Sequence, residues 1–333
     1  MKIIICFISF TTLIIISSTC YSNNLFESKY NKIEFKSKDI QNTKNNKFQE
    51  LKITNLKKIL KNILTSEGYK KIRNKIDGNF TDKLVKNILI EDELILESMY
   101  SANVKVNYDQ DLILQFLRNN KLSFIDYLPN YFFTIILDKK DIHNNLFSEE
   151  NDYYYYLLNT NNSKLKNFYK LPNLDINDKF LIKPINIINK DLESINKLLS
   201  KYNYSNSILI ISNLISGKVE IEVYIIQDYK IFFVENVITE KLNFESFFTN
   251  LQPKIIDVWK IHNSIQNENI KNIKCYFNSL TIYELKEIIS IIKSISVVSD
   301  YELKEIKLNK NLYEINYYGN FNILKRIFNM NLI

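Results

Sequence analysis

Residues 190–224 constrain the fold more than any other stretch, because they predict a helix and two strands in immediate succession. Apolar residues recur at helical spacing through residues 191–202. An apolar run of strand length follows at residues 207–212, and residues 219–226 alternate between apolar and charged. Gly217 lies between the two strands, where a tight turn requires a positive φ angle. A helix followed closely by strands predicts an α/β protein whose sheet is at least partly covered by helices.

The size and composition of the chain favour several folded units and argue against a nucleic-acid partner. Its 333 residues predict two or three units, and its 46% apolar content is ample for their cores. The net charge of +7 comes almost entirely from lysine. Only Arg73, Arg118 and Arg326 supply the guanidinium group that phosphate and guanine recognition favours. The lysines alternate with acids, as on a solvated surface, although they leave peripheral membrane association open.

The N-terminus predicts export. Lys2 precedes an apolar run at residues 3–16, and small or polar residues follow up to Ser22. This arrangement is typical of a secretory signal peptide, which we place at residues 1–22. An uncleaved anchor helix and a lipoprotein acylated at Cys20 are the alternatives. The expected location is therefore the periplasm or the cell envelope.

Cleavage after residue 22 would leave a single cysteine in the mature chain. Cys6 and Cys20 would leave with the signal peptide, so that only Cys275 remains. A lone thiol forms no intramolecular disulfide. We therefore interpret Cys275 as a small apolar side chain on a strand, in preference to a reactive thiol.

The pattern divides the mature chain into five parts. We expect a flexible lead-in at residues 23–46, an N-terminal α/β domain at 47–128, a central α/β domain at 129–240, a connecting helical segment at 241–269 and a C-terminal ferredoxin-like domain at 270–333. The lead-in is polar and without clear period, apart from a short strand at residues 33–35.

The N-terminal domain is predicted to contain mainly helices, with a strand after the third helix. Apolar spacing predicts helices at residues 48–64, 69–76 and 80–89, a strand period within 93–108 and a further helix at 112–119. Gly78 suits a helix stop between the second and third helices. Asp109 or Asp111 is placed to cap the fourth helix.

The central domain alternates strands with helices. We predict strands at residues 131–137, 180–188 and 230–236 beside those already described, with the first covered on both faces. Four tyrosines at residues 153–156 fit a helix whose rings partly pack, although a carbohydrate or partner surface is the alternative. A long connecting helix at residues 244–265 contains Pro253, which should kink or divide it.

The C-terminal residues predict a β-α-β-β-α order. Its elements are expected at residues 272–277, 281–292, 297–308, 312–318 and 320–328. This order is most of a ferredoxin-like sandwich. Thr281 and Glu284 stand three residues apart at the start of the first helix, which is the spacing of a capping box.

Four segments together resemble a known family. They are the helix at residues 48–64, the strand at 100–108 that ends in Tyr108-Asp109 before a helix, Lys201-Tyr202 ahead of the strand at 207–212, and residues 279–319 with their closing Tyr318-Gly319. In this order the chain resembles the proteobacterial exported family called domain of unknown function 2066 (DUF2066). The resemblance implies an envelope protein of α/β build, with no known catalytic residues to carry over.

No cofactor, metal or catalytic motif stands out in the sequence. Four glycines cannot build the glycine-rich phosphate loops, and there is no H-E-x-x-H or nucleophile elbow. The titratable residues that we considered are His143, His262, the acids Glu91, Asp92 and Glu93, and the pair Glu149 and Glu150. Adjacent acids in polar segments are usually solvated, and we expect Trp259 and His262 to form a packing pair.

These observations lead to one expected function and one alternative. We expect a non-enzymatic exported protein of the cell envelope that acts through contacts with other envelope proteins. The alternative is an exported hydrolase acting on cell-wall or polysaccharide material, which would need two acids, or a histidine with an acid and a nucleophile, in one pocket.

Overall fold

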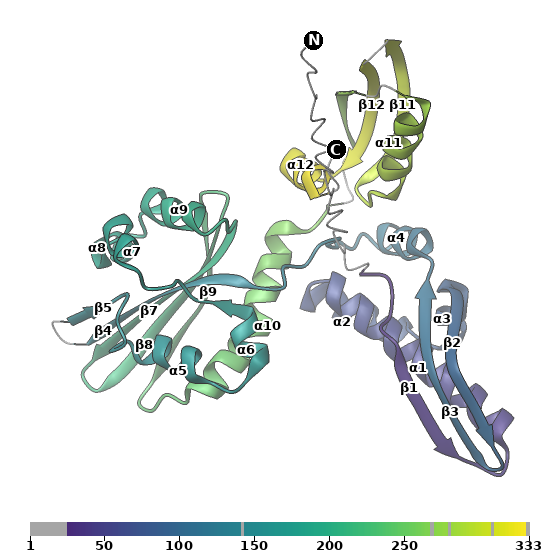
Figure 1. Cartoon of the computed structure of the whole chain (residues 1–333), viewed down its shortest axis with the longest axis horizontal. Helices are drawn as coiled ribbons and strands as arrows, with labels where there is room; N and C mark the ends of the chain where they lie inside the picture. Colours follow the sequence, from purple (N-terminus) through teal and green to yellow (C-terminus); the bar gives the residue numbers. More distant parts are fainter. Residues whose placement is uncertain (1–24, 141–142, 267–269, 279–280, 308–309, 331–333) are drawn as a thin grey trace, which may run out of the picture.

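The computed structural model describes residues 25–140, 143–266, 270–278, 281–307 and 310–330 (Figure 1). The predicted signal peptide, with Cys6 and Cys20, lies outside these residues. Within them the chain forms three sheets, each packed against helices. The predicted α/β class, built from several helix-on-sheet modules, is confirmed.

The N-terminal module packs a three-stranded antiparallel sheet of order β1-β3-β2 against a long helix. Alternate residues of β3, such as Tyr100, Val104 and Val106, are buried on the face toward α1. Val106 shares an apolar cluster with Leu56 and Leu60 of α1, whereas Tyr100 and Val104 cluster with earlier residues of that helix. The elements are β1 (Asn31–Lys36), α1 (Ile40–Ile63), α2 (Ser66–Ile72), the 3-10 helix η1 (Arg73–Lys75), α3 (Gly78–Leu84), β2 (Val85–Leu96), β3 (Met99–Tyr108) and α4 (Gln110–Asn119).

The lead-in was predicted too long. Helix α1 begins at Ile40, because the Asp39 side chain accepts a hydrogen bond from the Asn42 backbone and caps the helix. The first turns are polar on most sides, so they show no apolar period. Ile40 and Phe48 nevertheless pack against the buried Tyr100 and Val104 of β3. Tertiary packing therefore stabilises the first turns of α1, which the spacing of apolar residues does not predict.

The helix predicted at residues 80–89 is confirmed only as far as Leu84. Helix α3 ends at Leu84, and β2 runs from Val85 along β3. The apolar spacing of residues 80–89 fits a helix or a strand, and hydrogen bonding to β3 decides between them. Gly78 begins α3 instead of ending a helix, since Asp77 caps it by accepting from the Phe80 backbone.

The central module is built on a sheet of order β5-β4-β7-β8-β9, with β6 beside β4. Strand β4 is parallel to β7 and β6, and the other pairs are antiparallel. The elements are β4 (Phe132–Lys140), β5 (His143–Asn145), α5 (Asp152–Asn159), α6 (Ser163–Phe168), β6 (Tyr169–Lys170), α7 (Ile176–Leu181), α8 (Pro184–Ile188), α9 (Leu192–Lys201), β7 (Asn206–Ile215), β8 (Lys218–Gln227), β9 (Lys230–Thr239) and α10 (Phe244–Asn263).

Helices cover both faces of the central sheet. Helices α7, α8 and α9 lie over one face, and α5, α6 and α10 over the other (Figure 1). Phe133 and Leu209 point into the first layer, whereas Ile136 and Ile210 point into the second. This sandwich explains why β4 is apolar along nearly its whole length, as predicted.

Two local predictions for this module need correction. Residues 180–188 form the end of α7 and the whole of α8, with Pro184 in the first turn of α8, instead of a strand. Helix α10 continues through Pro253 as one element, so the proline does not divide it.

The C-terminal module confirms the predicted β-α-β-β-α order. It consists of β10 (Ile270–Phe277), α11 (Ile282–Ser294), β11 (Val298–Lys307), β12 (Lys310–Tyr318) and α12 (Phe321–Met330). The antiparallel sheet has the order β10-β12-β11, which places β12 between the two strands joined by α11, as in a ferredoxin-like fold. Thr281 and Glu284 form the predicted capping box.

The two outer modules share this topology. In the N-terminal module, β3 likewise lies between β1 and β2, and α4 follows it as α12 follows β12. The difference is that α2, η1 and α3 are inserted between α1 and β2. Strands β2 and β11 therefore occupy equivalent edges of their sheets.

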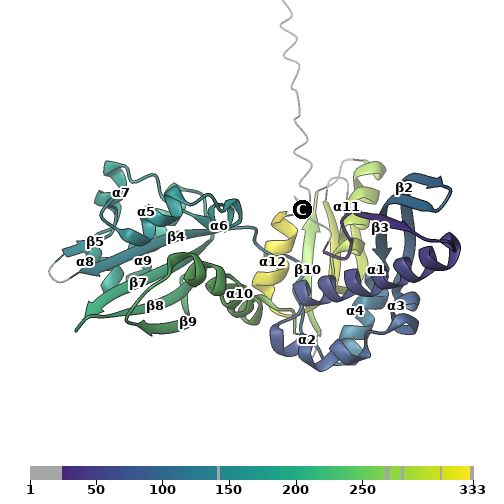
Figure 2. The ribbon, with the colours of Figure 1, turned by 90° about the horizontal axis from the view of Figure 1, so that it is seen from below.

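A compact junction joins the modules, with α10 running toward it from the central sheet (Figures 1 and 2). The amine of Lys260 on α10 donates to the carbonyls of Lys61 and Leu64 at the end of α1. Arg118 of α4 donates to the Ser296 carbonyl and lies over the ring of Tyr318. All three modules thus contribute to one apolar core.

Candidate functional site

The titratable residues singled out in the sequence lie on separate elements. Glu91, Asp92 and Glu93 are on β2, His143 is on β5, Glu149 and Glu150 precede α5, and His262 is near the end of α10. All of them are exposed. The structure therefore brings no histidine together with the acids of β2.

The other side chains that we considered are engaged in packing. His262 stacks on Phe232, with ring centroids 3.7 Å apart, and partial burial lowers its pKa with a smaller contribution from Lys230. Trp259 packs against Tyr127, so each of these two side chains has an aromatic partner other than the one expected. Cys275 is half-buried on β10, and burial raises the pKa of its thiol.

The described residues hold neither a metal-binding cluster nor a membrane-spanning helix. They contain no group of three or more His, Cys, Asp and Glu side chains that could hold a metal ion. No helix among them combines the length and apolar character needed to cross a membrane.

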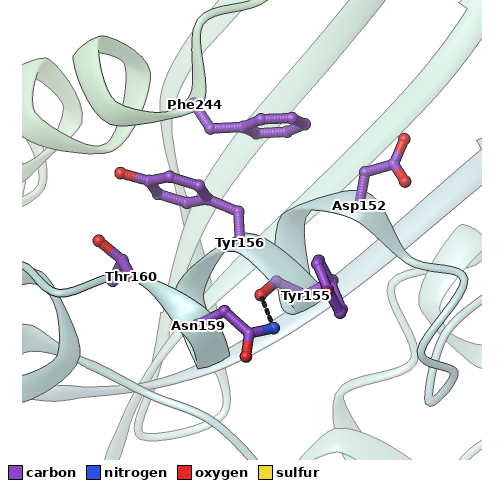
Figure 3. A pocket seen from close by; sticks show the side chains of 6 residues that line it. All are labelled: Asp152, Tyr155, Tyr156, Asn159, Thr160 and Phe244. Carbon is purple, nitrogen blue, oxygen red and sulfur yellow. Dashed lines mark hydrogen bonds between the residues drawn. The ribbon is translucent and has the colours of Figure 1, made fainter.

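A pocket of about 340 Å³ opens between α5 and the start of α10 (Figure 3). It is lined by Asp152, Tyr155, Tyr156, Asn159, Thr160 and Phe244. The rings of Tyr156 and Phe244 face each other, with centroids 5.5 Å apart and planes 19° apart. Asn159 is fixed by a 2.9 Å hydrogen bond to the Tyr155 carbonyl. The pocket therefore offers an aromatic wall with a few polar groups at its rim.

The four tyrosines at residues 153–156 lie on helix α5 and differ in burial. Tyr153 and Tyr154 are buried, Tyr156 stacks on Phe248 as well as Phe244, and Tyr155 is exposed. The hydroxyl of Tyr153 hydrogen-bonds the Ser212 hydroxyl on β7. The predicted helix with partly packed tyrosines is confirmed, and its outer face forms the pocket.

A carboxylate pair flanks the pocket at the end of β4. Lys140 forms an ion pair of 2.6 Å with Asp152 and lies 3.3 Å from the buried Asp138. Burial raises the pKa of Asp138, although Lys140 partly opposes this effect. Asp152 alone of these two acids lines the pocket, and its charge is balanced by Lys140.

A second surface stands out on the β2–β3 hairpin. Leu89, Ile90, Leu94, Ile95 and Leu96 of β2 are between 39% and 56% exposed. Leu89 and Leu94 lie on the open face of the sheet, opposite Lys105 and Ser101, whereas Ile90 and Ile95 are on the α1 side, opposite the buried Val104 and Tyr100. Strand β2 is thus apolar on both faces at a sheet edge.

Sequence reasoning missed this edge because it assigned the first half of β2 to a helix. A usable feature was present: two apolar triplets, at residues 88–90 and 94–96, flank three acids without a Gly or Pro. Only the pairing with β3 shows that both triplets belong to one exposed strand.

The fold and these surfaces define a multi-module α/β protein with an aromatic pocket and an apolar sheet edge. No family model, curated protein or solved structure matches this chain.

Proposed function

We propose that this protein is a non-enzymatic, exported component of the cell envelope that acts by binding another protein. The observation that carries the proposal is the β2 edge, where five large apolar side chains are exposed on a strand that pairs on one side only among the described residues. Monomeric proteins protect such edges, because unpaired backbone groups beside apolar side chains attract another chain.

Export is supported by the sequence rather than by the geometry. The charged Lys2, the apolar run at residues 3–16 and the small residues up to Ser22 are typical of a secretory signal peptide. The resemblance to DUF2066 favours the same location. Fractionation of the source cells should recover the protein, shortened by about the length of a signal peptide, outside the cytoplasm. A full-length protein confined to the cytosol would contradict export.

The hydrolase alternative has less support. The pocket on α5 presents one carboxylate, Asp152, and that group is engaged by Lys140. Glu149 and Glu150 precede the same helix but do not line the pocket. Glycoside hydrolysis by paired acids needs two carboxyl groups across the scissile bond, so protein binding is the better account.

Site-specific photo-crosslinking in the source cells tests protein binding directly. A photoreactive residue at Leu96 should give adducts of discrete mass, because this side chain lies exposed at the β2 edge. The matched control carries the same residue at Tyr229, which is exposed in the turn between β8 and β9. Adducts from both positions, or from neither, would contradict a specific partner surface at β2.

A further inference from the structure

The free side of β2 is open to strand addition. β2 pairs with β3 alone in the order β1-β3-β2, so its outer backbone groups have no strand partner within the described residues. Asp92 has a φ angle of 53°, and the register shifts between Glu91 and Leu94. These features mark a bulge that separates two short apolar segments of the same edge.

The charge of this hairpin is opposite to that of the chain. Residues 87–104 contain four carboxylates and no Lys or Arg, although the whole chain has a net charge of +7. Glu93 pairs with Lys44 of α1 at 2.6 Å. Glu91, Asp92 and Glu97 form no ion pair with any residue that the structure describes. Glu91 accepts a hydrogen bond from the Tyr30 hydroxyl and Asp92 from the Asn103 amide, so neutral donors, and no cation, meet these two carboxylates. The edge therefore joins apolar segments to an acidic centre in which only Glu93 is ion-paired.

The equivalent edge in the C-terminal module is built differently. Strand β11 carries Lys304, which bridges Glu302 and Glu314, and Lys307, which pairs with Glu305. Lysines and balanced charges on an edge strand oppose pairing with another chain. The two edge strands are topologically equivalent but differ in charge. Lysines in ion pairs oppose the pairing of β11 with another chain, whereas β2 carries no such ion-paired lysine along its apolar segments.

We propose that the β2 edge binds an extended segment of a partner protein in which Lys or Arg stands between apolar residues. This proposal rests on the proposed function and names the chemistry of the partner. The partner backbone pairs with the two apolar halves of β2. Its apolar side chains cover Leu89 and Leu94, and its basic side chains meet Glu91 and Asp92 at the bulge.

A second copy of this chain is a poorer occupant. Residues 88–96 read Ile-Leu-Ile-Glu-Asp-Glu-Leu-Ile-Leu, which is nearly symmetric about Asp92. The antiparallel register that matches apolar with apolar residues would therefore place Glu91 opposite Glu93 and Asp92 opposite Asp92. Like charges directly opposite one another destabilise a strand pair. A basic segment satisfies both the apolar and the charged positions.

The test uses the full chain and synthetic ten-residue peptides, with binding followed by fluorescence anisotropy. One peptide repeats Val-Thr-Lys-Thr, which places Val and Lys on the same face as Leu89 and Glu91 require. A second repeats Val-Thr-Glu-Thr, and a third is the Val/Lys peptide methylated on alternate backbone nitrogens. The Val/Lys peptide should bind about ten-fold more tightly than the Val/Glu peptide, and added salt should weaken it. Backbone methylation should abolish binding, because it removes the hydrogen bonds of strand addition.

Matched charge reversals locate the site. Glu91→Lys combined with Asp92→Lys should weaken Val/Lys binding about ten-fold. Asp300→Lys combined with Glu302→Lys makes the same charge change on β11 and should leave binding unchanged. Thermal melts confirm that both variants fold.

Four outcomes would overturn the proposal. Equal binding of the Val/Lys and Val/Glu peptides would exclude a basic partner, and insensitivity to methylation would exclude strand addition. Binding to vesicles of phosphatidylcholine and phosphatidylglycerol that Leu94→Asp abolishes, without peptide binding, would assign the hairpin to a lipid surface. Failure of the peptides while Leu96 still crosslinks to a protein would refute this chemistry and leave the proposed function standing.

Discussion

Lys260 shows how a single buried charge ties two modules together. Its side chain is almost fully buried, yet its amine donates hydrogen bonds of 2.7 and 2.8 Å to the carbonyls of Lys61 and Leu64. These carbonyls lie at the C-terminal end of α1, where a cation is favoured. Burial nevertheless lowers the pKa of Lys260 from 10.5 to about 8. Lys260 therefore links α10 to α1 by hydrogen bonds, although burial of its charge is unfavourable.

This lowered pKa predicts a specific pH dependence of stability. Between pH 8 and 10.5 the unfolded chain holds more protons at this residue than the folded chain, so the contribution of Lys260 to stability rises with pH. Urea unfolding at pH 7.5 and pH 10 should show the wild type gaining about 2 kcal/mol relative to Lys260→Met. Lys254→Met, on the same helix but exposed, is the control. A constant difference between wild type and Lys260→Met would contradict the shift.

A buried asparagine fixes the helix that carries the pocket. The amide of Asn151 donates to the carbonyls of Ile136 and Asn145, and its oxygen accepts from the Tyr154 backbone to cap α5. The side chain therefore holds α5 against the end of β4.

Removing this amide should be costly. We expect Asn151→Ala to lower the free energy of unfolding by about 2 to 4 kcal/mol, because two buried carbonyls and one helix end lose their partner. Asn162→Ala removes the exposed cap of α6 and should cost about 1 kcal/mol. Chemical denaturation compares the two variants, and equal losses would show that the buried contacts of Asn151 add nothing.

At the level of elements, the two hairpins of the central sheet use the same turn. Ser216 and Gly217 have φ angles of 51° and 78°, and Asp228 and Tyr229 have φ angles of 49° and 57°. Positive values at both central positions define a type I′ turn, which matches the twist of paired strands. The predicted positive φ of Gly217 is confirmed, whereas Tyr229 occupies a position that bulky side chains disfavour.

Substitutions in these two turns should change the stability of the protein in opposite directions. Gly217→Ala should destabilise the protein by about 1 kcal/mol, although no atom lies near the added Cβ, because the backbone conformation itself disfavours alanine. Tyr229→Asn should stabilise it by up to about 1 kcal/mol, since asparagine tolerates that conformation. Thermal unfolding of the two variants measures both effects. A stable Gly217→Ala protein would show that the turn relaxes to another type.

For the whole molecule, the junction between the outer modules depends on few polar contacts. Arg118 donates to the Ser296 carbonyl at 2.8 Å, and its guanidinium lies 4.4 Å from the centre of the Tyr318 ring. Ser296 also donates a 2.6 Å hydrogen bond to Asp126. The N-terminal and C-terminal modules therefore meet at a cluster in which one arginine makes two of the contacts.

Loss of Arg118 should loosen the C-terminal module. Arg118→Met removes a hydrogen bond and a cation–π contact, and we expect the free energy of local opening to fall by about 1 to 3 kcal/mol. Hydrogen exchange in β12 and α12 should accelerate, while exchange in β7 and β8 should stay constant. Arg73→Met, exposed in η1, should leave both regions unchanged. Equal acceleration in all three sheets would indicate global unfolding instead of module release.

The sequence by itself determined the features that depend on neighbouring residues. The capping box at Thr281 and Glu284 and the turn at Gly217 follow from local hydrogen bonds and backbone sterics, so they were predicted at the right residues. For the cap of α4 the sequence left Asp109 and Asp111 as candidates, and the structure selects Asp109. The tyrosine helix was predicted in the same way. These interactions span only a few residues, so the local sequence pattern is enough to predict them.

Only the tertiary structure decided the candidate surfaces. Strand β2 became an edge because it pairs with β3 alone among the described strands, and Phe244 completes the α5 pocket from a distant part of the chain. The strand predicted at residues 180–188 became two helices for a similar reason, since packing over the sheet overrides a short apolar run. Contacts between residues far apart in sequence leave no local periodicity, so these features appear only when the chain is folded.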